Sequence, residues 1–162
     1  MGNKAREFAL KAHGDQKYGT FPYSVHLDEV ASIAKSYGKT AEAVAFLHDV
    51  IEDTDITAKE IEQEFGCFIS RCVQILSDEP GDTRTIRKAA TYKKMGNVKG
   101  DESLALLVKA ADRLANMRAC IREGNEKYLT IYKSEYDVFR KSAYRFDLCE
   151  EIWAELESIQ HA

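Results

Sequence analysis

The chain has 162 residues, of which 44% are hydrophobic and 31% charged, and its formal net charge is −4. This length and composition predict one globular domain over residues 1–162 with a sizeable core. The negative charge argues against a general nucleic-acid binder, because neutralising a polymer's phosphates needs a clustered excess of Lys and Arg. No apolar run reaches the roughly 18 residues that a membrane-spanning helix needs, so no membrane partner is expected.

Apolar residues recur at helical spacing almost throughout the chain, which predicts an all-α fold. Thr40 is expected to cap the third helix, and Thr57 with Glu60 forms the T-x-x-E pattern of a capping box that starts the fourth. The expected helices are, in chain order, 3–14, from about 23–25 to 38, 40–53, 57–66, 67–77, 84–96, 102–122, and one or two after Gly124. The segment between the fifth and sixth of these, SDEPGDTR, is expected to be a loop.

The four cysteines form no CxxC pair and lie within helical patterns: Cys67, Cys72, Cys120 and Cys149. They are expected to be buried, reduced thiols, which is typical of a cytoplasmic protein. The N-terminus carries no signal-peptide core. The sequence makes no prediction about the oligomeric state.

The stretch AVAFLHDVIEDTD ends an apolar helical run with His48 and Asp49 side by side, followed by Glu52 and Asp53. In a continuous helix, residues four apart lie on the same side, so His48 would face Glu52 and Asp49 would face Asp53. Such a group is costly to bury and repulsive when exposed, unless a cation lies among its members. This end of the helix therefore predicts a cation or proton-transfer site.

Two residues distant in the sequence extend this set. His26 lies at the start of the second expected helix, and Asp112 follows the apolar stretch 104–108 on an inward-looking face, where an unpaired aspartate would be expensive. With His48 and Asp49 they form a mixed imidazole and carboxylate set without thiolates. Such a set suits Mn²⁺, Fe²⁺, Zn²⁺ or Mg²⁺ rather than a closed structural zinc site. Each residue alone has an ordinary structural explanation, but the combination is far more specific.

Three segments resemble one known family. AHGDQKYGTFPYSVHLDEVA resembles the AH-x-GQ…PY-x-x-H…VA opening of HD-domain phosphohydrolases, HDVIEDTD resembles their HD…ED signature, and VKAADRLANMR resembles their KLADRL-x-NMR segment. Their order and spacing are similar to those of the hydrolase domain of RelA/SpoT enzymes and of the small alarmone hydrolases. The resemblance implies a helical HD-domain bundle, a single Mn²⁺, and hydrolysis of the 3′-pyrophosphate of guanosine tetraphosphate (ppGpp) and its relatives.

The resemblance also implies a role for each matching residue. It gives metal binding to His26, His48, Asp49 and Asp112. Glu52 and Asp53 match the pair that acts on the attacking water, and Asn116 matches the asparagine that faces the nucleotide. Which carboxylate of the pair takes the water's proton is left open.

The loop GDQKYGTFPY departs from the family pattern. Asp15 stands in place of a glycine, Lys17 and Tyr18 lie near the position of the usual arginine, and the loop is one residue shorter. Lys17 could contact phosphate as a point charge, and Tyr18 could stack on a base or simply pack. This departure bears on the substrate and leaves the metal chemistry intact. The alternatives are an HD-type nucleotidase or phosphoesterase with another substrate, and a non-catalytic nucleotide-binding module.

Two further segments carry expectations about binding. On the basic helix expected at 84–96, Arg84, Arg87 and Lys88 are candidate phosphate-binding residues, because the corresponding segment of alarmone hydrolases lies near the site; a solvated surface helix is the alternative. The aromatic residues after Gly124 are expected to pack rather than to bind a nucleotide. The expected partner is thus a small-molecule nucleotide.

Overall fold

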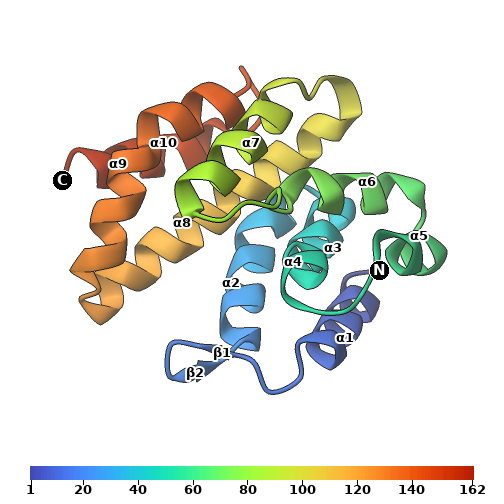
Figure 1. Cartoon of the computed structure of the whole chain (residues 1–162). Helices are drawn as coiled ribbons and strands as arrows, with labels where there is room; N and C mark the ends of the chain where they lie inside the picture. Colours follow the sequence, from blue (N-terminus) through green and yellow to red (C-terminus); the bar gives the residue numbers. More distant parts are fainter.

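The computed structural model describes residues Met1 to Ala162 and is helical apart from one short hairpin, which confirms the all-α class (Figure 1). The first part of the chain contains α1 (Gly2–His13), β1 (Lys17–Tyr18), β2 (Phe21–Pro22), α2 (Ser24–Ala34), η1 (Lys35–Tyr37), α3 (Lys39–Leu47), α4 (Val50–Asp53), α5 (Ala58–Phe65) and α6 (Cys67–Leu76). The second part contains α7 (Arg84–Gly96), η2 (Gly100–Ser103), α8 (Leu104–Glu123), α9 (Glu126–Ala143) and α10 (Glu150–Gln160).

The longest helix, α8, runs through the middle of the molecule (Figure 1). It packs against α2, α3 and α6 from the first part of the chain and against α9 and α10 from the second. Every residue from 105 to 115 is buried. This buried segment includes the charged residues Lys109, Asp112 and Arg113, which must therefore find partners inside the protein. None of the helices combines the length and the hydropathy of a membrane-spanning segment.

The helix expected over residues 40–53 is interrupted. α3 ends at Leu47 and α4 begins at Val50, with His48 and Asp49 between them. Asp49 has φ −102° and ψ 0°, outside the helical region, so the backbone turns at this point. The continuous helix expected over this segment is therefore wrong, and the turn places Asp49 3.8 Å from His26 of α2 and His48 3.3 Å from Asp112 of α8.

The ends of the helices show which local signals were reliable. The capping box is present, because Thr57 accepts from the Glu60 backbone and the Glu60 side chain accepts from the Thr57 backbone. Thr40 makes no capping hydrogen bond, since α3 already begins at Lys39 after Gly38. Cys67 is exposed, which corrects the expectation of burial for that thiol; the other cysteines are buried, and all are free.

The segment expected as a loop between α1 and α2 contains an antiparallel hairpin. Lys17 pairs with Pro22 and Tyr18 with Phe21. Gly19, in the tight turn, has φ +60°, a left-handed conformation that glycine adopts at little cost. Only two pairs of residues form this hairpin, too few to leave an alternating pattern in the sequence.

Candidate active site

Four side chains from three separate segments meet beside α8: His26 from α2, His48 and Asp49 from the turn after α3, and Asp112 from α8. His26 Nε2 lies 3.1 Å from Asp112 Oδ1 and 3.3 Å from His48 Nε2. His48 Nε2 lies 2.9 Å from Asp49 Oδ2 and 3.3 Å from Asp112 Oδ1. The structure therefore brings all four candidates together, while their role as metal ligands stays a prediction.

The hydrogen bonds of His48 define what this cluster can hold. Its Nδ1 lies 2.6 Å from the Ala45 carbonyl oxygen, and because a carbonyl only accepts, Nδ1 must carry the hydrogen. His48 Nε2 then points either a lone pair or a second proton toward the Asp49 and Asp112 carboxylates. A backbone-anchored imidazole of this kind is typical of metal-binding histidines. The donor set fits a divalent cation, which would relieve the repulsion among these acceptors.

Protonation follows the same electrostatics. Burial lowers the pKa of His48, but the Asp49 and Asp112 carboxylates outweigh it and raise that pKa well above its ordinary value. Burial raises the pKa of Asp112, whereas the His48 charge and the hydrogen bonds from His26 and His48 bring it well below its ordinary value. The cluster thus stabilises a positive charge at its centre, and either a proton or a metal ion can supply that charge.

A second layer of side chains orients this cluster. The Tyr23 hydroxyl donates to Asp49 Oδ2. Asn116 Nδ2 donates to Asp112 Oδ1 at 3.0 Å, and its Oδ1 accepts from the Tyr18 hydroxyl at 2.5 Å. The Tyr18 ring also stacks on His26, with ring centroids 4.6 Å apart and an interplanar angle of 16°. The hairpin therefore fixes one wall of the site.

Glu52 and Asp53 line the same cavity as Asp49 and Asp112. Glu52 Oε1 accepts from the backbone N–H of Asp78 at 3.0 Å. Glu52 is exposed as a residue, but protein atoms crowd its carboxyl group. This partial desolvation raises the pKa of Glu52 to about 7, although the positive charge of Lys109 acts to lower it. Asp53 Oδ2 accepts from Gln16 Nε2 at 3.0 Å.

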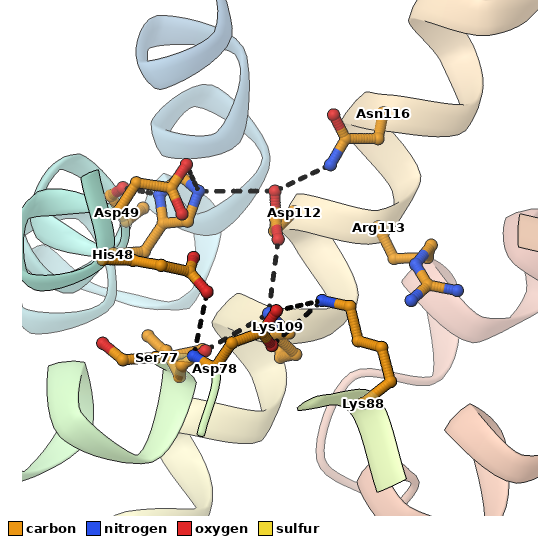
Figure 2. Close-up of polar contacts among 12 residues, drawn as sticks. His48, Asp49, Ser77, Asp78, Lys88, Lys109, Asp112, Arg113 and Asn116 are labelled. Atoms are coloured by element: carbon orange, nitrogen blue, oxygen red, sulfur yellow. Dashed lines mark hydrogen bonds and ion pairs between the residues drawn. The ribbon is translucent and has the colours of Figure 1, made fainter. Parts of the chain in front are cut away.

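The cavity has a volume of about 380 Å³, and basic side chains line it beside the acidic cluster. Figure 2 shows His48 and Asp49 on one side of Asp112, and Arg113 and Lys88 on the other. The basic residues that line the cavity are Arg84, Arg87, Lys88, Lys109 and Arg113. The expected basic helix, α7, thus faces the site with three side chains instead of forming only a solvated surface. Lys17 is exposed and does not line this cavity.

Sequence reasoning missed several residues of this cavity. Lys109 Nζ donates to the Leu76 carbonyl at 3.2 Å and lies 3.7 Å from Asp112 Oδ2. The Arg113 guanidinium lies 4.8 Å from the Tyr132 ring centroid. Tyr132, expected only to pack, lines both this cavity and an adjoining one of about 290 Å³. Lys109 and Arg113 could have been found, because they flank Asp112 within VKAADRLANMR.

A family model described as the HD domain matches residues 5–148. The chain belongs to the HD domain family. This HD domain is 34% identical over 163 residues to "GTP pyrophosphokinase rsh" of Brucella ovis, covering 97% of the chain and 22% of that protein. It is 31% identical over 145 residues to "Guanosine-3′,5′-bis(diphosphate) 3′-pyrophosphohydrolase" of Aquifex aeolicus, covering 88% of the chain and 21% of that protein. The HD domain therefore spans about a fifth of the length of these relatives.

A solved structure shares the fold of this HD domain. It is described as "A metazoan ortholog of SpoT hydrolyzes ppGpp and plays a role in starvation responses". The superposition has a TM-score of 0.72 at 23% identity and covers 96% of this chain and 94% of the other. At this level of identity the likeness shows the fold, including the helical HD arrangement expected from the sequence.

Proposed function

We propose that this HD domain is a metal-dependent phosphohydrolase that removes the 3′-pyrophosphate of guanosine tetraphosphate or pentaphosphate. The observation that carries the proposal is the cavity in which an imidazole and carboxylate cluster lies beside five basic side chains. Such a cavity suits a compact, highly charged substrate, because the basic residues neutralise phosphate charge. The printed activities of the Aquifex relative and of the metazoan protein support the choice of substrate.

The proposed cofactor is one divalent metal held by His26, His48, Asp49 and Asp112. Mn²⁺ is the first choice because the family resemblance implies it, and Fe²⁺, Zn²⁺ and Mg²⁺ are the alternatives that suit the same donors. When bound, the ion supplies a Lewis acid that polarises a phosphoryl oxygen and acidifies water. A cytoplasmic location and a small-molecule nucleotide partner remain predictions consistent with this chemistry.

In the proposed reaction a water oxygen forms a bond to the phosphorus attached to the 3′-oxygen. The bond from that phosphorus to the 3′-oxygen breaks, and pyrophosphate leaves. Glu52 takes the water's proton, since a pKa of about 7 suits a general base near neutral pH. Asp53 orients the water or returns a proton to the 3′-oxygen. Both carboxylates line the cavity, and the raised pKa of Glu52 is the reason to propose Glu52, and not Asp53, as the base.

The remaining candidates are proposed to bind substrate. Arg84, Arg87 and Lys88 line the cavity from α7 and would neutralise phosphate charge. Asn116 and Tyr18, hydrogen-bonded to each other, would contact the nucleoside at the junction with the adjoining cavity. Lys17 would reach phosphate only from outside the cavity.

A second candidate function keeps the chemistry but changes the substrate. Tyr18 stands near the place of the usual arginine, lies between the two cavities, and is already bonded to Asn116. This arrangement favours an HD-type nucleotidase with another base or sugar phosphate. The assay incubates the purified chain and Mn²⁺ with ppGpp and a panel of nucleotides. Release of pyrophosphate from ppGpp supports the first function; release of orthophosphate from nucleoside monophosphates alone supports the second.

The catalytic pair is tested by the double variant Glu52→Gln and Asp53→Asn. Because general acid–base groups typically contribute about 10²–10⁴-fold, turnover should fall by at least that factor while Mn²⁺ binding persists. The control is the double variant Asp55→Asn and Glu62→Gln, at two exposed acidic residues nearby in the sequence that do not line the cavity. Full turnover in the Glu52/Asp53 variant would refute these roles. Nucleotide binding by the wild type without turnover would favour the non-catalytic module.

A further inference from the structure

Asp78 lies between two residues that the proposed function uses. Its backbone N–H donates to Glu52 Oε1 at 3.0 Å, and its carboxylate accepts from Lys88 Nζ at 3.0 Å and 2.8 Å through its two oxygens. Glu52 belongs to α4 and Lys88 to α7, which are otherwise separate elements. Figure 2 shows Asp78 with the Lys88 ammonium beside it, below Asp112. One residue thus connects the acidic and basic parts of the cavity.

The Asp78–Lys88 ion pair is shielded from solvent. The side chain of Asp78 is 13% exposed and that of Lys88 is 14% exposed, and both residues line the cavity. Ion pairs at this level of burial are less screened than surface pairs. Lys88 also faces the like charges of Lys109 and Arg84, and without Asp78 its ammonium would have no carboxylate partner.

The backbone around Asp78 is anchored on both sides. Before it, the Leu76 carbonyl accepts from Lys109 Nζ at 3.2 Å and the Ser77 carbonyl accepts from Lys94 Nζ at 2.7 Å. After it, the Glu79 backbone N–H donates to Thr91 Oγ1 at 2.8 Å. These hydrogen bonds tie the segment to α7 and α8, so the backbone of Asp78 is held in a fixed position relative to both helices.

We propose that Asp78 is a positioning residue that fixes the Lys88 ammonium relative to Glu52, so that Lys88 is already in place to bind the substrate phosphate. The proposal rests on the proposed phosphohydrolase function. A lysine has a flexible stem and three N–H donors, so a carboxylate can hold it while leaving a donor for phosphate. Fixing such a group before substrate arrives spares the cost of ordering it during binding.

The test compares Asp78→Asn with Lys88→Met and with the double variant. Asp78→Asn keeps the backbone N–H toward Glu52 but removes the charge that holds Lys88. We expect KM for ppGpp to rise about tenfold in each single variant, with kcat changed less, because Lys88 contributes binding. If Asp78 acts through Lys88, the double variant should be no worse than either single variant. The control is Asp82→Asn, an exposed aspartate of the same loop.

A KM for Asp78→Asn equal to that of the wild type, or a double variant in which the two effects multiply, would overturn the inference. A second measurement needs no turnover: the Lys88 side-chain NMR signal, assigned by its loss in Lys88→Met, is titrated in wild type and Asp78→Asn. The Asp78 charge raises the pKa of Lys88, so the variant should titrate at lower pH. An unmoved titration would show that the contact is absent in solution. A wild type that releases no pyrophosphate would instead overturn the proposed function.

Discussion

Single residues in this site are held by hydrogen bonds whose donors can be named. The Tyr23 hydroxyl donates to Asp49 Oδ2, and its ring packs against His26, with centroids 5.6 Å apart. Burial and the Asp49 charge raise the pKa of Tyr23, so the hydroxyl keeps its proton and remains a donor. One carboxylate oxygen is thereby held in place, and Asp49 is oriented toward the centre of the cluster.

Tyr23→Phe tests this supporting role. The ring and its packing remain, while Asp49 loses a hydrogen bond, and loss of such outer partners typically costs about 10–100-fold in metal affinity. We expect Mn²⁺ binding, measured by titration calorimetry, to weaken within that range with little change in thermal stability. The control is Tyr37→Phe, because Tyr37 lines a different cavity. Equal Mn²⁺ affinity in Tyr23→Phe and wild type would contradict the supporting role.

Sequence predicted the elements better than it predicted their junctions. The periodic apolar pattern was sufficient for α1, α2 and α5 to α8, because burial of a helix face repeats every few residues. It could not reveal the turn at His48 and Asp49, which depends on a side-chain contact to the Ala45 carbonyl and on packing against α8. The convergence of His26 with Asp112 was predictable only from the motif, since no local rule brings together residues so far apart.

The start of α5 provides a prediction at the scale of an element. Thr57 and Glu60 satisfy backbone N–H groups at the helix start, and neither contacts the candidate site. Thr57→Ala should lower the free energy of unfolding by about 1 kcal/mol, the usual loss for a helix cap, without changing turnover. Denaturant unfolding measures the first quantity and the pyrophosphate assay the second. Thr20→Ala, in the exposed hairpin turn, serves as the control, and a Thr57→Ala midpoint matching it would refute the cap's contribution.

Over the whole molecule, the candidate site lies where the two parts of the chain meet along α8. The metal candidates come from α2, the turn after α3, and α8, whereas the basic residues come from α7 and α8. Arg113 joins the site to the second part, because its guanidinium lies 4.3 Å from the Phe139 ring centroid and donates to the Tyr92 hydroxyl at 2.9 Å. Packing of α9 therefore supports the basic side of the cavity through Arg113. We expect the imidazole and carboxylate cluster to depend on α9 less, because two of its three segments are α2 and the turn after α3.

Phe139→Ala tests this division. Phe139 is fully buried and packs against Trp153, with ring centroids 5.4 Å apart, so its removal should lower the free energy of unfolding by about 3–5 kcal/mol. At a temperature where the variant remains folded, KM for ppGpp should rise because Arg113 loses its support, while Mn²⁺ affinity stays within about twofold, or 0.4 kcal/mol, of wild type. The control is Phe146→Ala, at a residue that is 87% exposed, and this substitution should change neither quantity. If Mn²⁺ affinity falls while KM rises, the two sides of the cavity form one cooperative unit, and the separation drawn along α8 is wrong.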